Sequence, residues 1–440
     1  MQHVIVIGAG LAGLAAAREL RHAGLRVTVL ERGPQAGGRV CTDQVDGMPV
    51  EAGANFLASF YTRTYALLRE LGLAGELRPI PGRAAILRDG QLHRMWPNPR
   101  VVLTGLLPLR SKLALGGFPA SLLRRHSQLD VHAFHKAHAL DTCSVAEYAR
   151  RELNEEVLEY LLQPPLSGIF YWTPERTSLA MLFVVLRAGL SLHGMQLATL
   201  RRGLGALPKA MAEGLDLWLD TPVERVTREP DGRYLVNAHS GGALRPLWAD
   251  AVVCATTASA VPALLPQLTA RQRAFFEAVH YAPNVAAAFS LGRRLPSHFY
   301  GLLLPRRETD MLAAVTVQSA KQPGDTPAGR DGLVVHASGP ASAELLALDD
   351  AGVRAALLAE LRRTVPRYDP AADERAARVY RWREAVPEFD VGHFQRLREF
   401  AEGGIEPPGL VFAGDYLGGP FVEGAITSGQ QAAARLLQTM

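Results

Sequence analysis

Three glycines near the start of the chain have the spacing of a phosphate-binding turn. Gly8, Gly10 and Gly13 follow the pattern GxGxxG, between an apolar run and a segment of helical periodicity. In such a turn the first glycine permits a tight bend, the second lets a pyrophosphate approach the backbone, and the third lets the helix pack closely on the strand. Together with Leu11 and Ala12, these glycines are expected to hold the pyrophosphate of a dinucleotide.

A carboxylate follows where this kind of turn requires one. Glu31 ends the second expected strand, at a distance close to the ~20 residues typical of dinucleotide-binding folds. Its oxygens can accept hydrogen bonds from the ribose hydroxyls, and Arg32 is expected to contact the same nucleotide. A glycine turn alone is a weak signal, but the turn and the carboxylate together predict a dinucleotide-binding unit.

The residues after Glu31 indicate which dinucleotide is bound. A second glycine pair, Gly37 and Gly38, is followed directly by Arg39. These residues place another bare stretch of backbone and a guanidinium group against the same pyrophosphate. An NAD enzyme has no use for this second contact, so the pattern favours FAD.

Two further segments could enclose the flat ring of such a cofactor. Small residues at 53–56 could pass beneath the ring, and a late buried strand ends in a carboxylate shortly before a helix that runs toward the C-terminus. The first N–H groups of that helix would point at the electron-rich edge of the ring. The contacts expected from these segments are Gly53, Ala54, Asn55, Phe56, Gly414, Asp415, Phe421 and Val422, with Val223 and Trp382 in addition.

These motifs resemble those of the superfamily of flavin amine oxidases, protoporphyrinogen oxidases and carotenoid desaturases, over essentially the whole chain. Residues 160–170 (YLLQPPLSGIF), 381–393 (RWREAVPEFDVGH) and 414–419 (GDYLGG) are most similar to protoporphyrinogen oxidases. The resemblance implies that a reduced macrocycle gives hydride to the flavin in three two-electron rounds, with oxygen or another acceptor reoxidising it. Positioning and desolvation would do most of the work, so no catalytic residue is predicted.

Four departures bear on the subfamily. The triplet at 423–425, Glu-Gly-Ala, is more typical of amine oxidases and desaturases than of protoporphyrinogen oxidases. The lysine that amine oxidases hold near the flavin N5 has no counterpart on the strand expected at 284–291, and Phe421 stands where their aromatic cage has a Tyr. No cysteine lies beyond Cys254 to form their covalent flavin bond, so noncovalent FAD is expected.

A porphyrinogen-like tetrapyrrole is the favoured substrate. Its carboxylate arms would need cations, and arginines gather in one segment, of which Arg83 and Arg94 are the candidate substrate contacts together with Phe421. The arginines of this segment are Arg78, Arg83, Arg88, Arg94 and Arg100. The alternatives are an amine oxidase, a desaturase acting on a long polyene, and a flavin-fold binding protein without catalysis.

Composition excludes several other classes. A net charge of +4 with scattered arginines lacks the concentrated basic face of a nucleic-acid-binding protein. The three cysteines, Cys41, Cys143 and Cys254, are far apart and form no CxxC pair, and the histidines show no metal spacing, so neither a disulfide framework nor a metal site is expected. The sequence contains no run of ~18 or more apolar residues, the length that is needed to span a bilayer. A cytoplasmic location is expected.

The elements that must position these residues can be read from periodicity. Residues 3–31 form a βαβ unit, and helical patterns follow at 64–73 and 144–162. Strands are expected at 217–227, 234–238, 251–255, 285–291, 311–317, 333–337 and 375–381, with helices at 341–348 and 353–364. The mixture predicts an α/β fold, α+β overall, in which a mixed-sheet substrate domain is inserted into a discontinuous Rossmann-like FAD-binding domain.

The expected domain division follows from this order. Residues 1–75, 201–275 and 395–440 form the FAD-binding domain, residues 76–200 contribute to the substrate domain with a helical lid, and residues 276–394 supply its sheet and helices. Residues 97–125 mix Leu and Pro with Arg and Lys. They are interpreted as a lid over the pocket or as a surface that contacts a membrane peripherally. The sequence does not indicate an oligomeric state.

Overall fold

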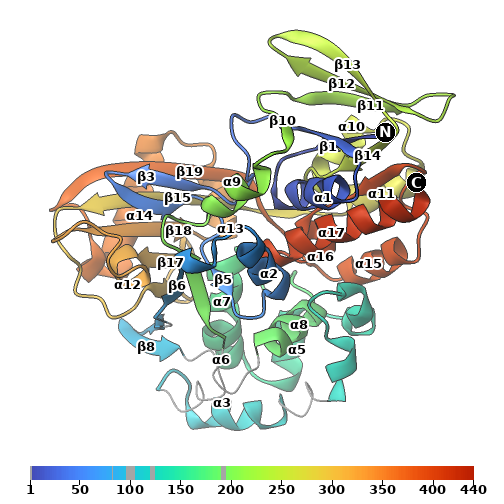
Figure 1. The fold of residues 1–440 in the computed structure, drawn as a ribbon. Helices are drawn as coiled ribbons and strands as arrows, with labels where there is room; N and C mark the ends of the chain where they lie inside the picture. The colour runs from blue at the N-terminus through green and yellow to red at the C-terminus, as the bar shows by residue number, and fades with distance from the viewer. Residues whose placement is uncertain (1, 82, 96–104, 119–123, 190–194) are drawn as a thin grey trace.

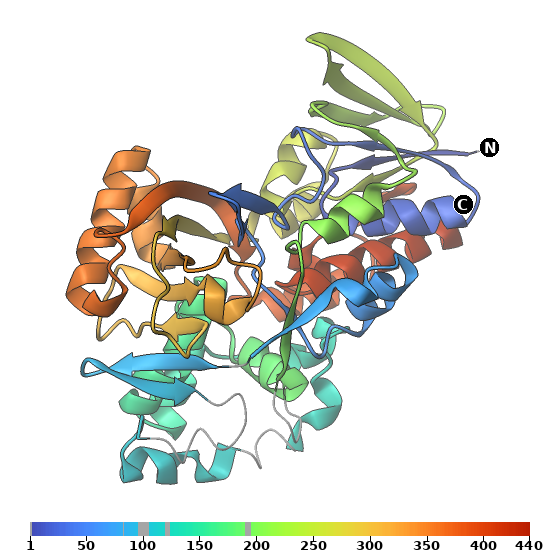
Figure 2. The same cartoon turned by 60° about the vertical axis from the view of Figure 1, so that its left-hand side comes forward.

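The computed structural model describes residues 2–81, 83–95, 105–118, 124–189 and 195–440. Three regions can be distinguished in Figure 1: a layered unit carrying both termini, a second unit built on a larger sheet, and a mostly helical region below them. The view turned by 60° keeps the same division (Figure 2). The expectation of a mixed α/β fold is confirmed.

A five-stranded parallel sheet forms the centre of the first unit. Its order is β10-β2-β1-β14-β20, and every neighbouring pair is parallel. The strands are β1 (His3–Ile7), β2 (Arg26–Leu30), β10 (Asp216–Trp218), β14 (Ala251–Cys254) and β20 (Leu410–Phe412). Because helices and loops cover both faces, β1 reads as the continuous apolar run expected of a buried parallel strand.

Two helices from opposite ends of the chain pack together on one face of this sheet. They are α1 (Leu11–His22) and α17 (Val422–Thr439), which lie side by side in both views (Figures 1 and 2). The approach is close because Gly429 of α17 faces the backbone of α1, where a Cβ atom would lie 2.1 Å from the Ala12 carbonyl oxygen. Helices α2 (Thr62–Glu70), α9 (Ala206–Ala212), α10 (Val261–Leu264), α11 (Ala270–Glu277), α15 (His393–Ala401) and α16 (Asp415–Gly418) surround this pair and the sheet.

A three-stranded antiparallel sheet projects from the first unit at the top of Figure 1. It consists of β11 (Val223–Arg228), β12 (Tyr234–Ser240) and β13 (Ala243–Ala249). The single strand expected at 217–227 is therefore wrong, because β10 and β11 belong to different sheets. The break lies at Asp220, whose φ of 47° is left-handed, and Pro222, which cannot donate to a ladder.

The second unit is a seven-stranded mixed sheet of order β19-β15-β18-β17-β16-β7-β8. Its strands are β7 (Ala84–Arg88), β8 (Gln91–Met95), β15 (Tyr281–Leu291), β16 (Gly301–Leu303), β17 (Leu312–Val317), β18 (Asp331–Ala337) and β19 (Glu374–Pro387). The outer side of this sheet is covered by α13 (Gly339–Leu345) and α14 (Asp350–Thr364), while α12 (Gln318–Lys321) follows β17. Strand β19 is longer than the segment expected at 375–381 because it pairs with β15 along most of its length.

Two small sheets join the units. One pairs β3 (Thr42–Val45) with β4 (Met48–Glu51), and the other has the order β5-β9-β6, from Leu57–Ala58, Leu197–Leu200 and Leu77–Ile80. The five-stranded sheet uses residues 3–30, 216–254 and 410–412, as the expected discontinuous FAD-binding domain requires. The boundaries between the domains stay a prediction.

The helical region contains α3 (Leu109–Ala114), α5 (Val145–Glu152), α6 (Glu155–Val157), a π-helical turn (Leu158–Leu162), α7 (Gln163–Phe170) and α8 (Leu179–Gly189). The continuous helix expected at 144–162 is therefore wrong. Leu153 leaves the helical conformation, and the Asn154 side chain then accepts a hydrogen bond from Val157 N and starts a new helix. An Asn at this point favours a helix start over a helix interior.

Part of the segment interpreted as a lid or membrane contact can be placed. Residues 105–118 and 124–125 are described, whereas 97–104 and 119–123 lie outside the described residues. Leu109 and Leu113, one turn apart on α3, are 72% and 71% exposed. Among the helices of the described ranges, none combines the length and the hydropathy needed to cross a membrane.

Candidate cofactor and substrate site

One large cavity, of about 1240 Å³, lies between the two sheet units. On one side it is lined by residues that follow the carboxyl ends of parallel strands, namely Gly8 after β1, Glu31 after β2, Ala255 after β14 and Gly414 just beyond β20. Ligands of open parallel sheets bind at this edge. The cavity is larger than the 300–1,000 Å³ typical of a site for one small molecule, so it can accept a cofactor and a substrate together.

The opposite wall is one face of the seven-stranded sheet. Its lining residues come from neighbouring strands and include Asn284 on β15, Leu303 on β16, Ala314 and Thr316 on β17, His336 on β18 and Ala84 on β7.

The glycine turn has the geometry that its spacing predicts. Gly8 has a φ of 100°, which favours glycine, and its N–H donates to the Leu30 carbonyl. A Cβ atom on Gly13 would lie 1.9 Å from the Gly8 carbonyl oxygen, so the helix could not otherwise pack so closely. A Cβ atom on Gly10 would meet nothing within 4 Å. The open space over Gly10, with Leu11 and Ala12 beside it, fits a pyrophosphate.

Glu31 binds the backbone of the glycine turn, which the sequence did not indicate. Its Oε2 accepts a hydrogen bond from Ala9 N at 2.7 Å, and its Oε1 accepts one from Gly33 N at 2.8 Å. The carboxylate therefore ties the glycine turn to the end of β2. Each carboxylate oxygen has further acceptor capacity, and Glu31 and Arg32 both line the cavity, so acceptance from ribose hydroxyls remains sterically available.

The second glycine pair joins the first turn directly. Gly37 and Gly38 have φ angles of 120° and 55°, and Gly37 N donates to the Ala9 carbonyl at 2.8 Å. A side chain on Gly37 would strike the Val40 carbonyl. The two glycine segments therefore lie against each other and offer bare backbone to the same part of the cavity.

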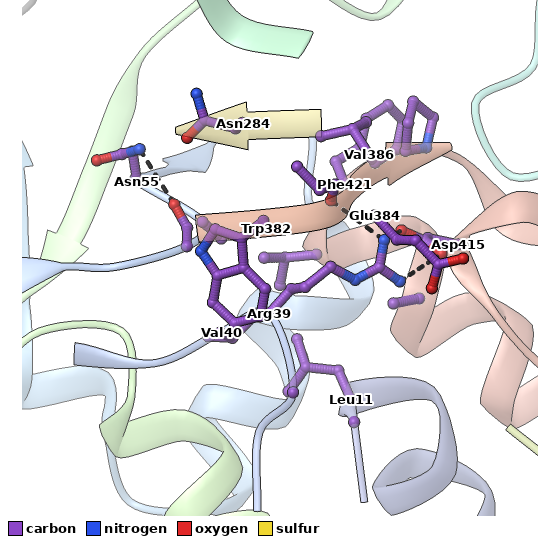
Figure 3. A pocket seen from close by; sticks show the side chains of 18 of the residues that line it. Leu11, Arg39, Val40, Asn55, Asn284, Trp382, Glu384, Val386, Asp415 and Phe421 are labelled. Atoms are coloured by element: carbon purple, nitrogen blue, oxygen red, sulfur yellow. Dashed lines mark hydrogen bonds and ion pairs between the residues drawn. The ribbon is translucent and has the colours of Figure 1, made fainter. Parts of the chain in front are cut away.

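The positive charge of Arg39 is balanced by the carboxylate of Asp415. Its guanidinium donates to Asp415 at 2.9 Å and to the Ala385 carbonyl at 3.2 Å, as the dashed lines in Figure 3 show. Burial works to lower the Arg39 pKa, but Asp415 and nearby groups outweigh it, and the pKa is raised. The pair connects the second glycine segment to the end of β20, so Arg39 stabilises the arrangement of the site.

The other end of the cavity fits a flat ring. Gly53 packs on Arg39, where a Cβ atom would lie 2.0 Å from the Arg39 carbonyl oxygen. Asn55 Nδ2 donates to the Gly53 carbonyl at 3.1 Å, and Trp382 Nε1 donates to the Ala52 carbonyl at 2.5 Å. These bonds fix the loop that holds Gly53, Ala54, Asn55 and Phe56 against β19, and Figure 3 shows Asn55 and Asn284 at the opposite side of the view from the Arg39–Asp415 pair.

Helix α17 begins at this ring end. Phe421 is its extended N-cap residue and Val422 its first residue, and both line the cavity. Glu423, in contrast, points away from the cavity: its buried carboxylate accepts hydrogen bonds from Arg63 N and from Thr64 N and Oγ1, at 2.6–2.8 Å. The Glu of the Glu-Gly-Ala triplet thus caps α2. At the start of α17, the backbone and not the Glu423 side chain therefore faces the cavity.

Aromatic rings form much of the remaining wall. Phe421 stacks on Tyr61 with ring centroids 5.6 Å apart, and Phe60 meets Phe421 edge to face at 5.7 Å. Further rings come from α7 and from the seven-stranded sheet, namely Phe170, Tyr171, Tyr300 and Trp382. Such walls accept flat apolar molecules.

The remaining sequence candidates are placed as follows. Val223 lines the cavity near Glu31. Arg83 and Arg94 are exposed and are not among the lining residues, although their neighbours Ala84 and Met95 are. Arg78 donates to two backbone carbonyls, and Arg88 pairs with Glu156 and lies over the Tyr160 ring. Arg100 lies outside the described residues.

Several polar lining residues were missed by the sequence reasoning, and four of them are considered together. Lys321, His336, Asn284 and Tyr171 are all buried and come from α12, β18, β15 and the end of α7. Tyr171 and His336 Nδ1 lie 3.3 Å apart in a hydrogen bond, and burial lowers the pKa of His336 to about 4. The only signal in the sequence was a polar residue within an apolar strand, which does not reveal a shared cavity. Within the described ranges, no group of three or more His, Cys, Asp or Glu could hold a metal ion.

Comparison with known proteins agrees with this geometry. Residues 11–437 match the model of the family described as flavin containing amine oxidoreductase. The chain belongs to this family. It is therefore a flavin-dependent oxidoreductase, as the motifs predicted.

Individual relatives are more distant. The coproporphyrinogen III oxidase of Bacillus subtilis (strain 168) is 25% identical, with 99% of this chain and 98% of that protein covered. A crystal structure from Exiguobacterium sp. 255-15, named as a protoporphyrinogen oxidase, superposes with a TM-score of 0.80 at 23% identity, covering 100% and 99% of the two chains. Putrescine oxidase bound to putrescine has a TM-score of 0.76 at 21% identity, covering 99% of both chains. The structural likenesses show the fold alone.

Proposed function

We propose that the chain binds FAD noncovalently and oxidises a carboxylated porphyrinogen-like tetrapyrrole. The observation that carries this proposal is the single cavity, which has a dinucleotide site at one end and aromatic walls at the other. The alternatives are a flavin amine oxidase and a polyene desaturase. A binding protein without catalysis is disfavoured because the family consists of oxidoreductases.

The residues present fit FAD. The open space over Gly10, the bare backbone at Gly38 and the carboxylate of Glu31 would hold its pyrophosphate and ribose, and the first N–H groups of α17 would face its ring. When bound, FAD supplies a hydride acceptor that oxygen or another oxidant regenerates. None of the three cysteines lines the cavity, which supports a noncovalent attachment.

The contribution of the protein to oxidation is positioning and the exclusion of water. Tyr61 and Phe421 make one flat wall, and Phe170 and Leu303 face them from the substrate side. A broad aromatic cavity suits a macrocycle better than a small amine. The relative from Bacillus subtilis, which is named a coproporphyrinogen III oxidase, supports the same class of substrate. Phe421 would contact both cofactor ring and substrate.

Carboxylate arms extending from the macrocycle would meet cations at the cavity rim. Arg83 is adjacent to Ala84 and Arg94 to Met95, and both of these neighbours line the cavity. We assign the two arginines to the rim and not to the interior. Guanidinium groups at an entrance favour an anionic substrate over a cationic amine.

We further propose that residues 97–125 contact a membrane surface peripherally. On α3, Leu109 and Leu113 are exposed beside Arg110, whose side chain is 77% exposed. Apolar side chains flanked by cations suit peripheral contact with the cytoplasmic face of a membrane. The domain division proposed from the sequence places this segment in the substrate domain.

A panel of substrates tests the proposal. The purified protein is mixed without oxygen with a carboxylated porphyrinogen, a benzylamine-type amine or a polyene, and bleaching of the flavin absorbance is followed. Bleaching by the porphyrinogen alone supports the proposal. Rapid bleaching by simple amines, with none by the porphyrinogen, would replace it with amine oxidation and leave the FAD site intact.

A further inference from the structure

One buried cation in the cavity wall has no hydrogen-bond partner. Lys321, on α12, is 1% exposed, lines the cavity, and makes no hydrogen bond through Nζ. An ammonium group buried in this way costs several kcal/mol unless its charge is compensated. Its Nζ donors, which have no acceptor within the protein, therefore call for an acceptor on the cavity side.

The choice of a lysine is itself informative. The chain contains 47 basic residues, of which only Lys112, Lys136, Lys209 and Lys321 are lysines. Arginine, which makes up nearly all the other basic residues, keeps its charge and presents a planar fork, whereas lysine presents one compact charge with rotatable donors. A single acceptor atom in the cavity would match this geometry.

A buried carboxylate balances the charge. Glu51, at the end of β4, is 3% exposed, and its two oxygens accept hydrogen bonds from Leu204 N at 2.8 Å and from Thr42 Oγ1 at 2.7 Å. Burial raises the pKa of Glu51 and lowers that of Lys321, and each group favours the charged form of the other.

The surroundings place the ammonium at the ring end of the cavity. Glu51 stands two residues before Gly53, the start of the loop that carries Asn55. His336 is close enough that Lys321 helps to depress its pKa, and Asn284 on the next strand donates to the Ala337 carbonyl at 3.4 Å. All these neighbours belong to the region that would enclose the flat ring.

We infer that Lys321 donates to an acceptor on the ring of bound FAD and stabilises the negative charge that the ring gains on reduction. The strand expected to align with the lysine-bearing strand of amine oxidases has Ala286 and Ala288 on this face, so here the cation comes from a different element. Lys321 thus raises the reduction potential of the flavin. The inference rests on the proposed FAD site and is independent of the proposed substrate.

The test is the midpoint potential of bound FAD, measured without substrate by equilibration with a redox dye. Lys321→Met keeps the length of the side chain and removes its charge. We expect the reduced form to lose at least tenfold in relative stability, a fall of about 30 mV for a two-electron couple. Lys209→Met, at an exposed position outside the cavity, is the matched control and should keep the wild-type potential.

A double variant distinguishes the loss of the Lys321 charge from misfolding caused by an unpaired Glu51. Lys321→Met leaves Glu51 buried and unpaired, whereas the double variant Lys321→Met/Glu51→Gln removes both charges and should fold with the same lowered potential. A wild-type potential in both Lys321 variants overturns the inference. So does an unchanged potential accompanied by a raised KM, which would assign Lys321 to the substrate.

Discussion

Replacing Glu31 by Ala should weaken FAD binding far more than a surface substitution. The carboxylate accepts hydrogen bonds from Ala9 N at 2.7 Å and from Gly33 N at 2.8 Å, and it also faces the ribose end of the cavity. The variant therefore removes a ribose acceptor and, at the same time, the brace that holds the glycine turn in place.

The expected magnitude follows from these contacts. A hydrogen bond to a charged group contributes about 1.5–3 kcal/mol, so loss of the ribose contact alone should raise the Kd for FAD by about 10- to 150-fold. Loss of the hydrogen bond from Ala9 N also leaves the glycine turn less ordered. Part of the binding free energy must then order the turn, so the Kd rises further. Glu31→Gln keeps one acceptor oxygen and should fall between the wild type and Glu31→Ala.

The assay is titration of the apoprotein with FAD, followed by quenching of flavin fluorescence. Glu277→Ala, in an exposed position on α11, is the matched control and should leave the Kd unchanged. An unaltered Kd in Glu31→Ala, with the protein folded by circular dichroism, would refute the role assigned to this carboxylate.

Four further outcomes are expected. Gly10→Ala should keep the melting temperature of the apoprotein but abolish FAD binding, whereas Gly13→Ala, whose Cβ would lie 1.9 Å from a carbonyl oxygen, should lower the melting temperature sharply. Acid precipitation should release the yellow colour into the supernatant, because no cysteine lines the cavity. Burial lowers the pKa of His336 to about 4, below its unfolded value near 6.5, so its neutral form supports stability above pH ~6.5 and up to about 3 kcal/mol is lost as the pH falls to 4; His336→Gln should flatten this loss in urea unfolding. Arg83→Ala should raise KM for a carboxylated porphyrinogen at unchanged FAD content.

Each of these has a control or a contrary result. A Gly10→Ala protein that binds FAD normally would remove the pyrophosphate from that position. Colour retained in the acid pellet would show a covalent bond. His22→Gln, at an exposed site, should leave the acid sensitivity as it is, and His336→Gln should remove only part of it because burial also lowers the pKa of His393 to about 4. Arg271→Ala, likewise exposed, should not alter KM.

Local spacing was enough to predict the glycine turn and the position of Glu31 beside it. Gly8, Gly10, Gly13 and Glu31 act through backbone geometry within one βαβ unit, so the constraints on them are short-range and visible in the sequence. The family followed from motifs of the same kind. The missed boundary at Asn154 was also local, since a side chain that caps a new helix competes with the helix interior.

The substrate side of the cavity depended on the tertiary structure. Lys321 and Glu51 are 270 residues apart, and nothing in either neighbourhood indicates that the two charges share a buried site. His336 looked like a polar interruption in an apolar strand until the order β15-β18-β17 put it on the cavity face. The contact of Arg83 and Arg94 with a substrate stays a prediction, since both residues are exposed and only their neighbours Ala84 and Met95 line the cavity.

The sequence by itself determined the family, the cofactor-binding turn and the kind of fold, because strands, turns and glycine contacts are set by neighbouring residues. Only the tertiary structure decided which charges meet in the cavity, because long-range pairing of strands brings together residues that no local pattern connects.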